Sequence, residues 1–457
     1  MKTPFLQTVR EKTVQLCHWL RETRPAQAVL RFFALCERHS FLTQCLLVVL
    51  LRLSLDVVYV TVLSPVFDDI GFIVSIDPLF YLCTWLALLA FMPVHVRLSQ
   101  DRTPSALIVA FLDYLFFIPL TSYCGCSGSD IRFFLIAMVY WAALLFFQLR
   151  LPVLTLKRPH LRVSRPLMVG LTVFSCVFIL YISGRYTGFR FTLNFIDVYG
   201  IRAEAAAYDI PTLFRYILSS MTVVLSFLLL YWMERKKWTV VAPLCVLYLI
   251  FYSIDTQKSV FFLLVLILLC RFFYREWMLR WAGGFLSLFC AVGLAEKALL
   301  GSFWLVNMFI RRMLYLPVLI CQQYGEFFRN NPQNLFRDGI MGKISFDAIY
   351  STRIPRIIGE FRGHPAESAN SGLLGDLFAN FPVSLGIFLL PLILVICFRL
   401  LDMTSSSLRT RFVLPVCFYY ACCFLSGSWS TVVLSNGFLI ACFLFFFYPN
   451  EEGLSHG

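Results

Sequence analysis

Arginines gather in two stretches of the chain. Segment 184–210 holds Arg185, Arg190 and Arg202. Segment 301–371 holds a larger basic group, which consists of Arg311, Arg312, Arg329, Arg337, Lys343, Arg353, Arg356 and Arg362. A guanidinium group offers a planar fork of N–H donors that fits the paired oxygens of a phosphate or diphosphate, whereas a lysine is only a point charge. The preference for arginine therefore predicts an anionic ligand.

The same arginines also have a structural interpretation. They can pair with carboxylates, or lay their aliphatic stems along apolar surface and place their charged heads among lipid headgroups. The acidic residues available for pairing are Asp197, Glu204, Asp209, Glu326, Asp338, Asp347, Glu360 and Glu367. Any single arginine is explained in this way, but the clustering of the whole set favours a ligand.

The elements that hold these stretches are predicted to be membrane spans. Hydrophobic residues make up 59% of the 457 residues and charged residues 14%, against roughly a quarter charged in soluble domains. The mean hydropathy is +0.77. These values exclude a disordered chain and a soluble enzyme, and they predict an all-α polytopic membrane protein. About twelve apolar runs approach the ~20 residues that cross a bilayer, namely 42–63, 79–94, 104–122, 131–149, 166–183, 211–233, 238–253, 259–275, 279–300, 372–400, 412–427 and 431–448.

The distribution of basic residues predicts that both termini are cytoplasmic. Short loops on that side carry Lys or Arg, whereas the first loop on the other side has Asp68, Asp69 and Asp77 and no basic residue. This is the pattern of the positive-inside rule. The net charge of +13 therefore reflects membrane topology, and no nucleic-acid partner is expected. The predicted parts are a cytoplasmic amphipathic segment 1–41, a bundle of about nine helices over 42–300 with the external loop 184–210, a long external loop 301–371, about three helices over 372–448, and a cytoplasmic tail 449–457.

Segment 301–371 is too long for a simple connector. Its first part predicts an amphipathic helix, because apolar residues recur at steps of 3 and 4 from Leu305 to Phe327. We expect this helix to lie near the membrane surface, with a kink at Pro317. Its polar face either lines a cavity over the bundle or belongs to an interfacial helix without chemistry, and it consists of Asn307, Arg311, Tyr315, Gln322, Glu326 and Arg329.

Two further patterns lie in the first part of the chain. Arg52 and Asp56 are four residues apart in the first predicted span, so we expect them to pair on one helical face. Cys124 and Cys126 are predicted to lie in a short external loop. No histidine or second cysteine pair stands beside them, so a zinc site is not expected.

Motifs in the external segments follow one another in a recognisable order. The order is Arg311-Arg312, Pro317, Tyr324-Gly325-Glu326-Phe327-Phe328, Asn331-Pro332, Tyr350, Ile358-Gly359, Asn370-Ser371-Gly372 and Asp376-Leu377-Phe378-Ala379-Asn380-Phe381. Further matches are Asp56-Val57-Val58-Tyr59, Ser64-Pro65, Val198-Tyr199-Gly200-Ile201-Arg202 and Lys258-Ser259. This order resembles that of the Wzy-type polymerases of oligosaccharide repeat units, and it touches most of the chain. Pro382 departs from the family pattern, which has glycine there.

The resemblance implies a GT-C-like fold and a glycosyltransferase of the bacterial inner membrane that needs neither metal nor cofactor. Such an enzyme would join undecaprenyl-diphosphate-linked oligosaccharides into O-antigen or capsular polysaccharide at the external face of the membrane. These lipid-linked units would be both donor and acceptor. Other expected partners are membrane lipids, a chain-length regulator and a flippase.

The resemblance also implies roles for the basic residues. Three arginines match family positions and would stabilise the lipid-diphosphate leaving group; they are Arg202, Arg311 and Arg312. Five more residues would bind the same substrates, namely Arg185, Arg190, Lys258, Arg353 and Arg356.

The acceptor hydroxyl would need a base within hydrogen-bond reach. The candidates are His364, Glu360 and Glu367, with Glu326 as a further one. Tyr324, Asn370 and Asn380 would contact substrate. Asn370 is also expected to cap the start of a helix, as asparagine often does.

Three other functions stay open. A ligase of similar fold would use the same donor to move a finished glycan to a lipid A core. A flippase or other transporter of lipid-linked oligosaccharides would place its charges along the midplane of the bundle. Apart from five arginines near the ends of the runs, which are counted with the loops (Arg132, Arg271, Arg275, Arg280 and Arg399), only Arg52, Arg215 and Lys297 among basic residues fall within predicted spans, which disfavours transport. The third is a purely structural partner of a biosynthetic complex.

Overall fold

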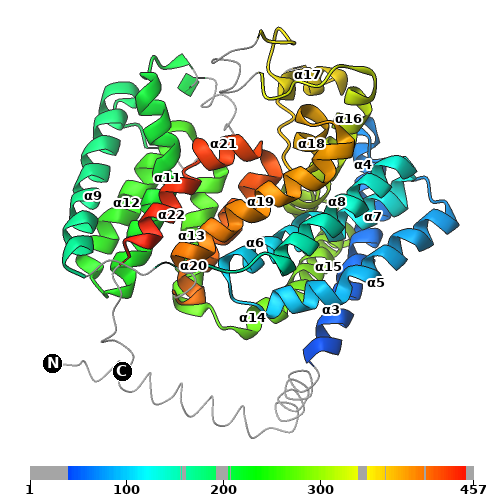
Figure 1. Cartoon of the computed structure of the whole chain (residues 1–457), viewed down its shortest axis with the longest axis horizontal. Coiled ribbons are helices and arrows are strands. Elements are labelled where there is room, and N and C mark those ends of the chain that lie inside the picture. The colour runs from blue at the N-terminus through cyan, green and yellow to red at the C-terminus, as the bar shows by residue number, and fades with distance from the viewer. Residues whose placement is uncertain are drawn as a thin grey trace, which may run out of the picture.

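The structure is a computed structural model that describes residues 40–154, 156, 161–191, 204–205, 207–337, 347–365, 367–405 and 408–448 (Figure 1). The predicted N-terminal amphipathic segment, the C-terminal tail and Arg202 lie outside these residues. Every regular element of the described residues is helical, which confirms the predicted all-α class.

Eight helical segments in the described part of the chain are long and apolar enough to cross a membrane. They are Ser40–Ile70, Pro78–Gln100, Pro104–Ser127, Ile131–Arg150, Arg165–Thr187, Thr212–Glu234, Ala282–Leu300 and Val383–Ser405. Two shorter apolar helices, Trp238–Ile254 and Thr410–Ser426, match further predicted runs. By helix length and composition, the chain is thus a polytopic membrane protein. The total of about twelve spans stays a prediction.

The helical elements follow one another in this order: α3 (Ser40–Val58), η1 (Tyr59–Leu63), α4 (Ser64–Phe67), η2 (Asp68–Ile70), α5 (Pro78–Gln100), α6 (Pro104–Leu112), η3 (Asp113–Phe117), α7 (Ile118–Ser127), α8 (Ile131–Arg150), α9 (Leu161–Ile182), η4 (Ser183–Thr187), α11 (Thr212–Glu234), α12 (Trp238–Asp255), α13 (Lys258–Phe273), α14 (Trp277–Arg280), α15 (Ala282–Leu300), η5 (Val306–Tyr315), α16 (Leu316–Asn330), α17 (Ile354–Phe361), α18 (Leu374–Asn380), α19 (Val383–Ser405), α20 (Thr410–Ser426), α21 (Trp429–Leu434) and α22 (Phe438–Phe446).

Two predicted spans are interrupted. The run 372–400 is divided into α18 and α19 at Pro382, which cannot donate a backbone hydrogen bond. The run 431–448 is divided into α21 and α22 at Gly437, whose φ of +74° is a left-handed conformation that glycine adopts readily. Each interruption therefore has a local cause in the sequence.

Three stretches of π-helix each come just before a proline. A proline ring inside a helix clashes with the carbonyl four residues earlier and removes a hydrogen-bond donor. A widened π turn accommodates this defect, and such turns are frequent at functional sites. In each case the carbonyl that faces the ring lies within the π segment: Thr61 of η1 before Pro65, Leu115 of η3 before Pro119, and Met313 of η5 before Pro317.

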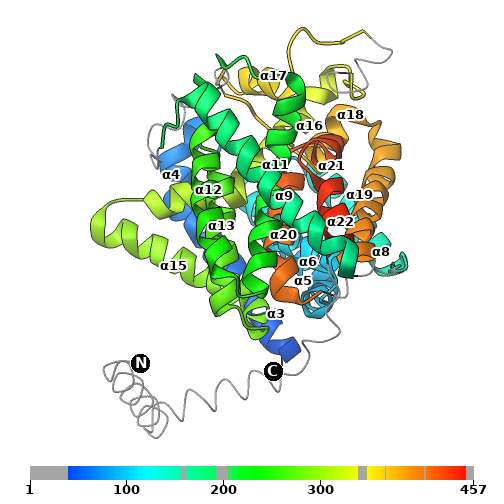
Figure 2. The ribbon, with the colours of Figure 1, turned by 90° about the vertical axis from the view of Figure 1, so that its left-hand side faces the viewer.

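The helices pack around a central span. The segment made of α6, η3 and α7 has 94% of its apolar window buried, more than any other candidate span. Helix α3 packs against α7 and α15, α19 against α8, and α20 against α6. Helices α16, α17 and α18 lie at the end of the bundle where α4 is found, opposite to the start of α3 (Figures 1 and 2). We call this the outer end, because the predicted orientation places it outside the cell.

The helix predicted in the long loop is present, and it packs against helices of the bundle. Residues 304–330 form one helix through η5 and α16, and Leu316 keeps helical dihedral angles next to Pro317. The helix is therefore not interrupted at Pro317. It contacts η1, α7 and α18, and its buried apolar residues include Val306, Ile310, Leu314 and Val318. Four residues of the predicted apolar face are only half-buried, namely Leu305, Phe309, Met313 and Leu316. Residue spacing predicts that a helix has an apolar face, but it does not specify which positions other helices cover. The location near the membrane surface stays a prediction.

Candidate functional site at the outer end

The centre of the candidate site is Arg311 on η5. The side chain is buried, with only 9% of the residue exposed. Its Nε donates a hydrogen bond of 2.8 Å to Oδ1 of Asn307, one turn earlier. The guanidinium carbon lies 4.4 Å from the centre of the Phe67 ring on α4. A buried guanidinium held from two sides is preorganised, since less side-chain freedom is lost when a ligand binds. Arg312 beside it is half-buried.

A second cation lies close to the same aromatic group. The rings of Phe67 and Phe303 meet edge to face at 5.8 Å, and Nζ of Lys297 lies 5.1 Å from the Phe303 ring. Cations are attracted to ring faces, with more effect where water is excluded. Arg311 and Lys297 thus flank one aromatic pair at the outer end, where they add positive charge of the kind an anionic headgroup would require.

Glu296 fixes the start of the helix that carries Arg311. Its carboxylate accepts hydrogen bonds from the backbone N–H groups of Trp304 and Leu305, both at 2.9 Å, and from Ser302 Oγ at 2.6 Å. An acidic side chain satisfies the unpaired N–H groups at a helix N-terminus and complements its dipole. The end of α15 is thereby joined to the start of the helix 304–330.

Polar groups continue along α16. Nε2 of Gln322 donates to Glu326 at 2.8 Å, whereas the side-chain oxygens of Gln322 and Gln323 are buried without a hydrogen-bond partner in the described structure. Gly71 lies against Gln323. Buried acceptors of this kind are unfavourable unless another group donates to them. Sugar hydroxyls are suitable donors.

The two arginines of the other external stretch that are described lie apart from Arg311. Arg185 is exposed, and its guanidinium carbon is 5.8 Å from the ring of Tyr186. Arg190 forms an ion pair with Glu204. The hydrogen bond with Glu204 raises the pKa of Arg190, and the same bond lowers the pKa of Glu204. For Arg190 the structural interpretation is therefore confirmed. Lys258, also predicted to bind substrate, is half-buried at the start of α13.

The candidate bases form a separate group around α17. Arg356 and Glu360 on this helix are exposed, and so is Arg353, the residue before it. The loop after α17 folds back so closely that a Cβ at Gly359 would lie 2.2 Å from the carbonyl oxygen of Glu367. This return brings Glu367, which is exposed, and the half-buried His364 beside α17.

Helix α17 packs near the far end of α16. The rings of Phe361 and Phe327 are 5.5 Å apart. Phe327 follows Arg311 by sixteen residues along one helix, which corresponds to roughly 24 Å at ~1.5 Å per residue. His364, Glu360 and Glu367 are therefore not brought together with Arg311.

Tyr324 and Asn380 hold the outer end together. The Tyr324 hydroxyl donates to the carbonyl of Ala369 at 2.9 Å, and the residue is buried. Oδ1 of Asn380 accepts from the backbone N–H of Phe336 at 2.8 Å, while its Nδ2 donates to Asp376 at 2.7 Å. The polar side-chain atoms of both residues, which the resemblance predicts to contact substrate, thus form hydrogen bonds within the protein.

The predicted capping role of Asn370 is wrong. Helix α18 starts at Leu374, and the preceding Leu373 has a φ of +45°. Asn370 is exposed, and its Oδ1 accepts from Ser368 Oγ at 3.2 Å. The chain therefore turns sharply between Asn370 and the helix, so that its side chain does not serve the helix start.

The cysteine motif is not in a loop. Cys124 and Cys126 are buried within α7, which extends five residues beyond the predicted run to Ser127. Across the described residues there is no group of three or more His, Cys, Asp or Glu side chains arranged to hold a metal ion.

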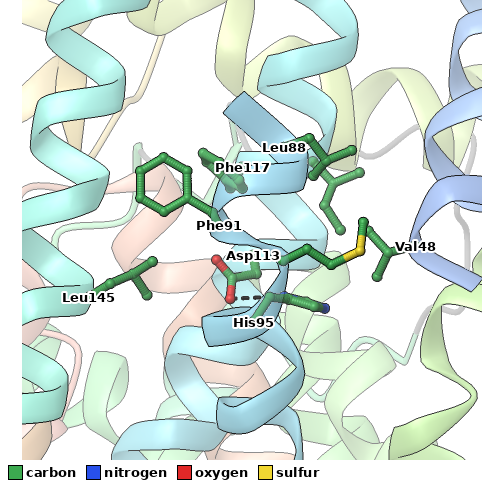
Figure 3. Close-up of a pocket in the computed structure, with 9 residues that line it drawn as sticks. Val48, Leu88, Phe91, His95, Asp113, Phe117 and Leu145 are labelled. Carbon is green, nitrogen blue, oxygen red and sulfur yellow. Dashed lines mark hydrogen bonds and ion pairs between the residues drawn. The ribbon is translucent and has the colours of Figure 1, made fainter. Parts of the chain in front are cut away.

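A polar group that the sequence did not single out lies deeper in the bundle (Figure 3). Nδ1 of His95 is 3.0 Å from Oδ2 of Asp113, and Nε1 of Trp141 donates to Oδ1 of Asp113 at 2.9 Å. Nε2 of His95 has no hydrogen-bond partner among the described residues and lines a small cavity with Val48, Leu88 and Met92. The cavity has a volume of about 10 Å³, enough for about one water molecule. A sugar or diphosphate does not fit there.

Comparison with known proteins adds no relative. No protein-family model, curated protein or solved structure matches this chain.

Proposed function

We propose that the protein is a membrane glycosyltransferase that polymerises undecaprenyl-diphosphate-linked oligosaccharide units, in the manner of the O-antigen and capsule polymerases. The observation that carries the proposal is the buried guanidinium of Arg311 at the outer end, positioned by Asn307 and Phe67. A preorganised donor in a site that excludes water is the main requirement for stabilising a diphosphate leaving group.

In the proposed reaction, an acceptor sugar hydroxyl attacks the carbon that joins the growing chain to its lipid diphosphate. The new bond is carbon to acceptor oxygen, the bond to the diphosphate oxygen breaks, and the hydroxyl proton passes to a base. Arg311, with Arg312 beside it, would stabilise the charge that develops on the diphosphate. No nucleotide sugar takes part.

The base must lie within hydrogen-bond reach of the attacking hydroxyl. Because α17 packs near the far end of α16, the group of His364, Glu360 and Glu367 is too far from Arg311 to take this proton in the described arrangement. We therefore place this group, with Arg353 and Arg356, along the carbohydrate of a bound unit.

The proposal is tested with purified protein and undecaprenyl-diphosphate-linked oligosaccharide in detergent or liposomes. We expect longer glycans to form without nucleotide sugars. Arg311→Ala should lower the rate about 10²- to 10³-fold, the range for loss of one preorganised donor. Arg311→Lys should also be poor, because a lysine cannot reproduce the fork of donors.

The matched control is Arg132→Ala, which removes an exposed arginine at the start of α8. It should leave the rate unchanged. If no longer product forms and the substrate instead crosses the membrane of the liposomes, the protein is a carrier. A deletion strain distinguishes a polymerase from a ligase. Without a polymerase a single repeat unit is still attached to the core, whereas without a ligase no glycan is attached.

A further inference from the structure

A buried ion pair lies beneath η5. Arg52 and Asp56 of α3 form the predicted pair, and Arg52 has no exposed surface. Nη2 of Arg52 donates to Thr121 O at 2.8 Å and to Thr84 Oγ1 at 3.2 Å. Its guanidinium carbon also lies 5.0 Å from the Trp85 ring. The pair is confirmed, and it joins α3 to α5 and α7.

The carboxylate of Asp56 collects several donors. Tyr81 OH donates to Oδ2 at 2.8 Å, and Ser122 Oγ donates to Oδ1 at 2.5 Å. With Arg52, these donors occupy both oxygens of the carboxylate. Asp56 therefore has a structural role in joining the helices around it.

The hydrogen-bonded group around Asp56 is joined to η5 by the hydroxyl of Tyr315. Tyr315 OH lies 2.8 Å from Ser122 Oγ and donates to the carbonyl of Leu55 at 2.8 Å. The Tyr315 ring also lies 5.4 Å from the Tyr59 ring. Tyr315 is fully buried and follows Arg311 by four residues, about one turn of the same helix.

Helix 304–330 thus meets the first span at two points one turn apart. Arg311 lies over Phe67, and Tyr315 is bonded at Leu55 and Ser122. A π-helical turn holds its hydrogen bonds in an uncommon pattern that needs support from its surroundings. The Tyr315 contacts supply that support on the side facing the bundle.

Gly125 leaves the space that the Arg52 guanidinium and its partners occupy. A Cβ at this position would lie 2.7 Å from Thr84 Oγ1 and 3.0 Å from Arg52 Nη2. Any larger residue must therefore displace the Arg52 guanidinium or its partners. The glycine lies between the two cysteines of the Cys124-Gly125-Cys126 motif, and this gives the motif a role that does not involve sulfur.

We propose that Asp56, Ser122 and Tyr315 are positioning residues, which fix η5 against the first span and thereby hold the Arg311 guanidinium in place for the reaction. The positioning of Arg311 for catalysis rests on the proposed function, whereas the link between the buried pair and η5 does not.

The variant Tyr315→Phe removes the linking hydroxyl and keeps the ring. We expect faster amide hydrogen exchange in segment 306–330 and a fall in kcat of about ten- to a hundredfold, the range for small misplacement of a catalytic group. The KM for the lipid-linked unit should change less than about threefold, because charge stabilisation of the leaving group acts mainly in the transition state. Gly125→Ala should act in the same direction while every hydrogen-bonding group is kept.

The matched control is Tyr420→Phe in α20. Tyr420 is as buried as Tyr315, but its hydroxyl has no hydrogen-bond partner in the described structure. This control should leave both exchange in 306–330 and kcat unchanged. If Tyr315→Phe and Gly125→Ala also leave exchange in 306–330 unchanged, the positioning proposal is overturned. If exchange rises but the wild-type protein forms no longer glycan, the link is supported and the proposed function is overturned.

Discussion

Three ionisable residues buried in the bundle are each held by more than one hydrogen-bond partner. Arg52, Asp56 and Asp113 lie within apolar spans, and each makes at least two hydrogen bonds. Removing one member of such a group leaves the others with unmet hydrogen-bonding capacity, and this is more destabilising than removing both.

The pair of His95 and Asp113 tests this rule. Asp113→Leu should destabilise the protein by about 3–5 kcal/mol, because it leaves the His95 Nδ1 and the Trp141 N–H without a hydrogen-bond partner in an apolar interior. The double variant with His95→Leu should be destabilised by less than the sum of the two single variants. Thermal or denaturant unfolding in detergent measures the effect. Strict additivity of the two substitutions would show that the residues do not depend on each other.

At the scale of elements, the π segment η5 is tied to the proline that follows it. Its widened turn accommodates the missing donor and the ring of Pro317, and it sets the direction in which Arg311 points. The sequence predicted a helix with a kink here, and the structure instead widens the turn before the proline.

Replacing this proline separates stability from function. In Pro317→Ala the reason for the wide turn is gone, so the segment can tighten into an α-helix, which is the more favourable form for alanine. We expect unchanged or higher thermal stability together with a rate of glycan extension at least about tenfold lower, because Arg311 turns away from Phe67. Full activity in this variant would show that the π geometry is not required.

A second element-scale prediction concerns the contact between α8 and α16. Arg329 forms an ion pair with Asp130, the residue before α8. The hydrogen bond from the backbone N–H of Arg132, together with Arg329, lowers the pKa of Asp130 below its usual 3.8. A carboxylate with a lowered pKa stabilises the fold above its unfolded pKa and loses this effect as the pH falls through the folded pKa.

The expected result is therefore acid sensitivity. As the pH falls below about 4, the wild-type Tm should drop towards that of Asp130→Asn, and the difference between the two should be constant at higher pH. Melting curves from pH 3 to 7 for both proteins measure this difference. A gap between the two Tm values that persists at low pH would contradict the assignment.

For the whole molecule, the predicted orientation assigns α4, α16 and α17 to the outside of the cell. Short epitope tags test it in intact cells. A tag inserted at Gly301, an exposed turn with a φ of +65° between α15 and the helix 304–330, should be reached by antibody without permeabilisation. A tag in the basic turn 235–237 should be reached only after permeabilisation. The reverse pattern would invert the topology and remove the proposed site from the external face.

Residue composition and spacing alone predict the class of the molecule and its local pairs. Long apolar runs require helices, because a membrane offers the backbone no other hydrogen-bond partner. The spacing of Arg52 and Asp56 was enough to predict their ion pair, since residues four apart share a helical face. The periodicity of apolar residues also predicts the helix within 301–371. The clustering of arginines predicts an anionic ligand.

Which of these residues contact one another depends on how the helices pack. The contact of Tyr315 with Leu55 joins positions 260 residues apart, and that of Tyr324 with Ala369 joins positions 45 apart. Apolar spacing reports that a helix has a face to bury, but not which helix will cover it. Packing against η1, α7 and α18 determines which side of the helix 304–330 is buried, and it places the Tyr324 hydroxyl on the carbonyl of Ala369.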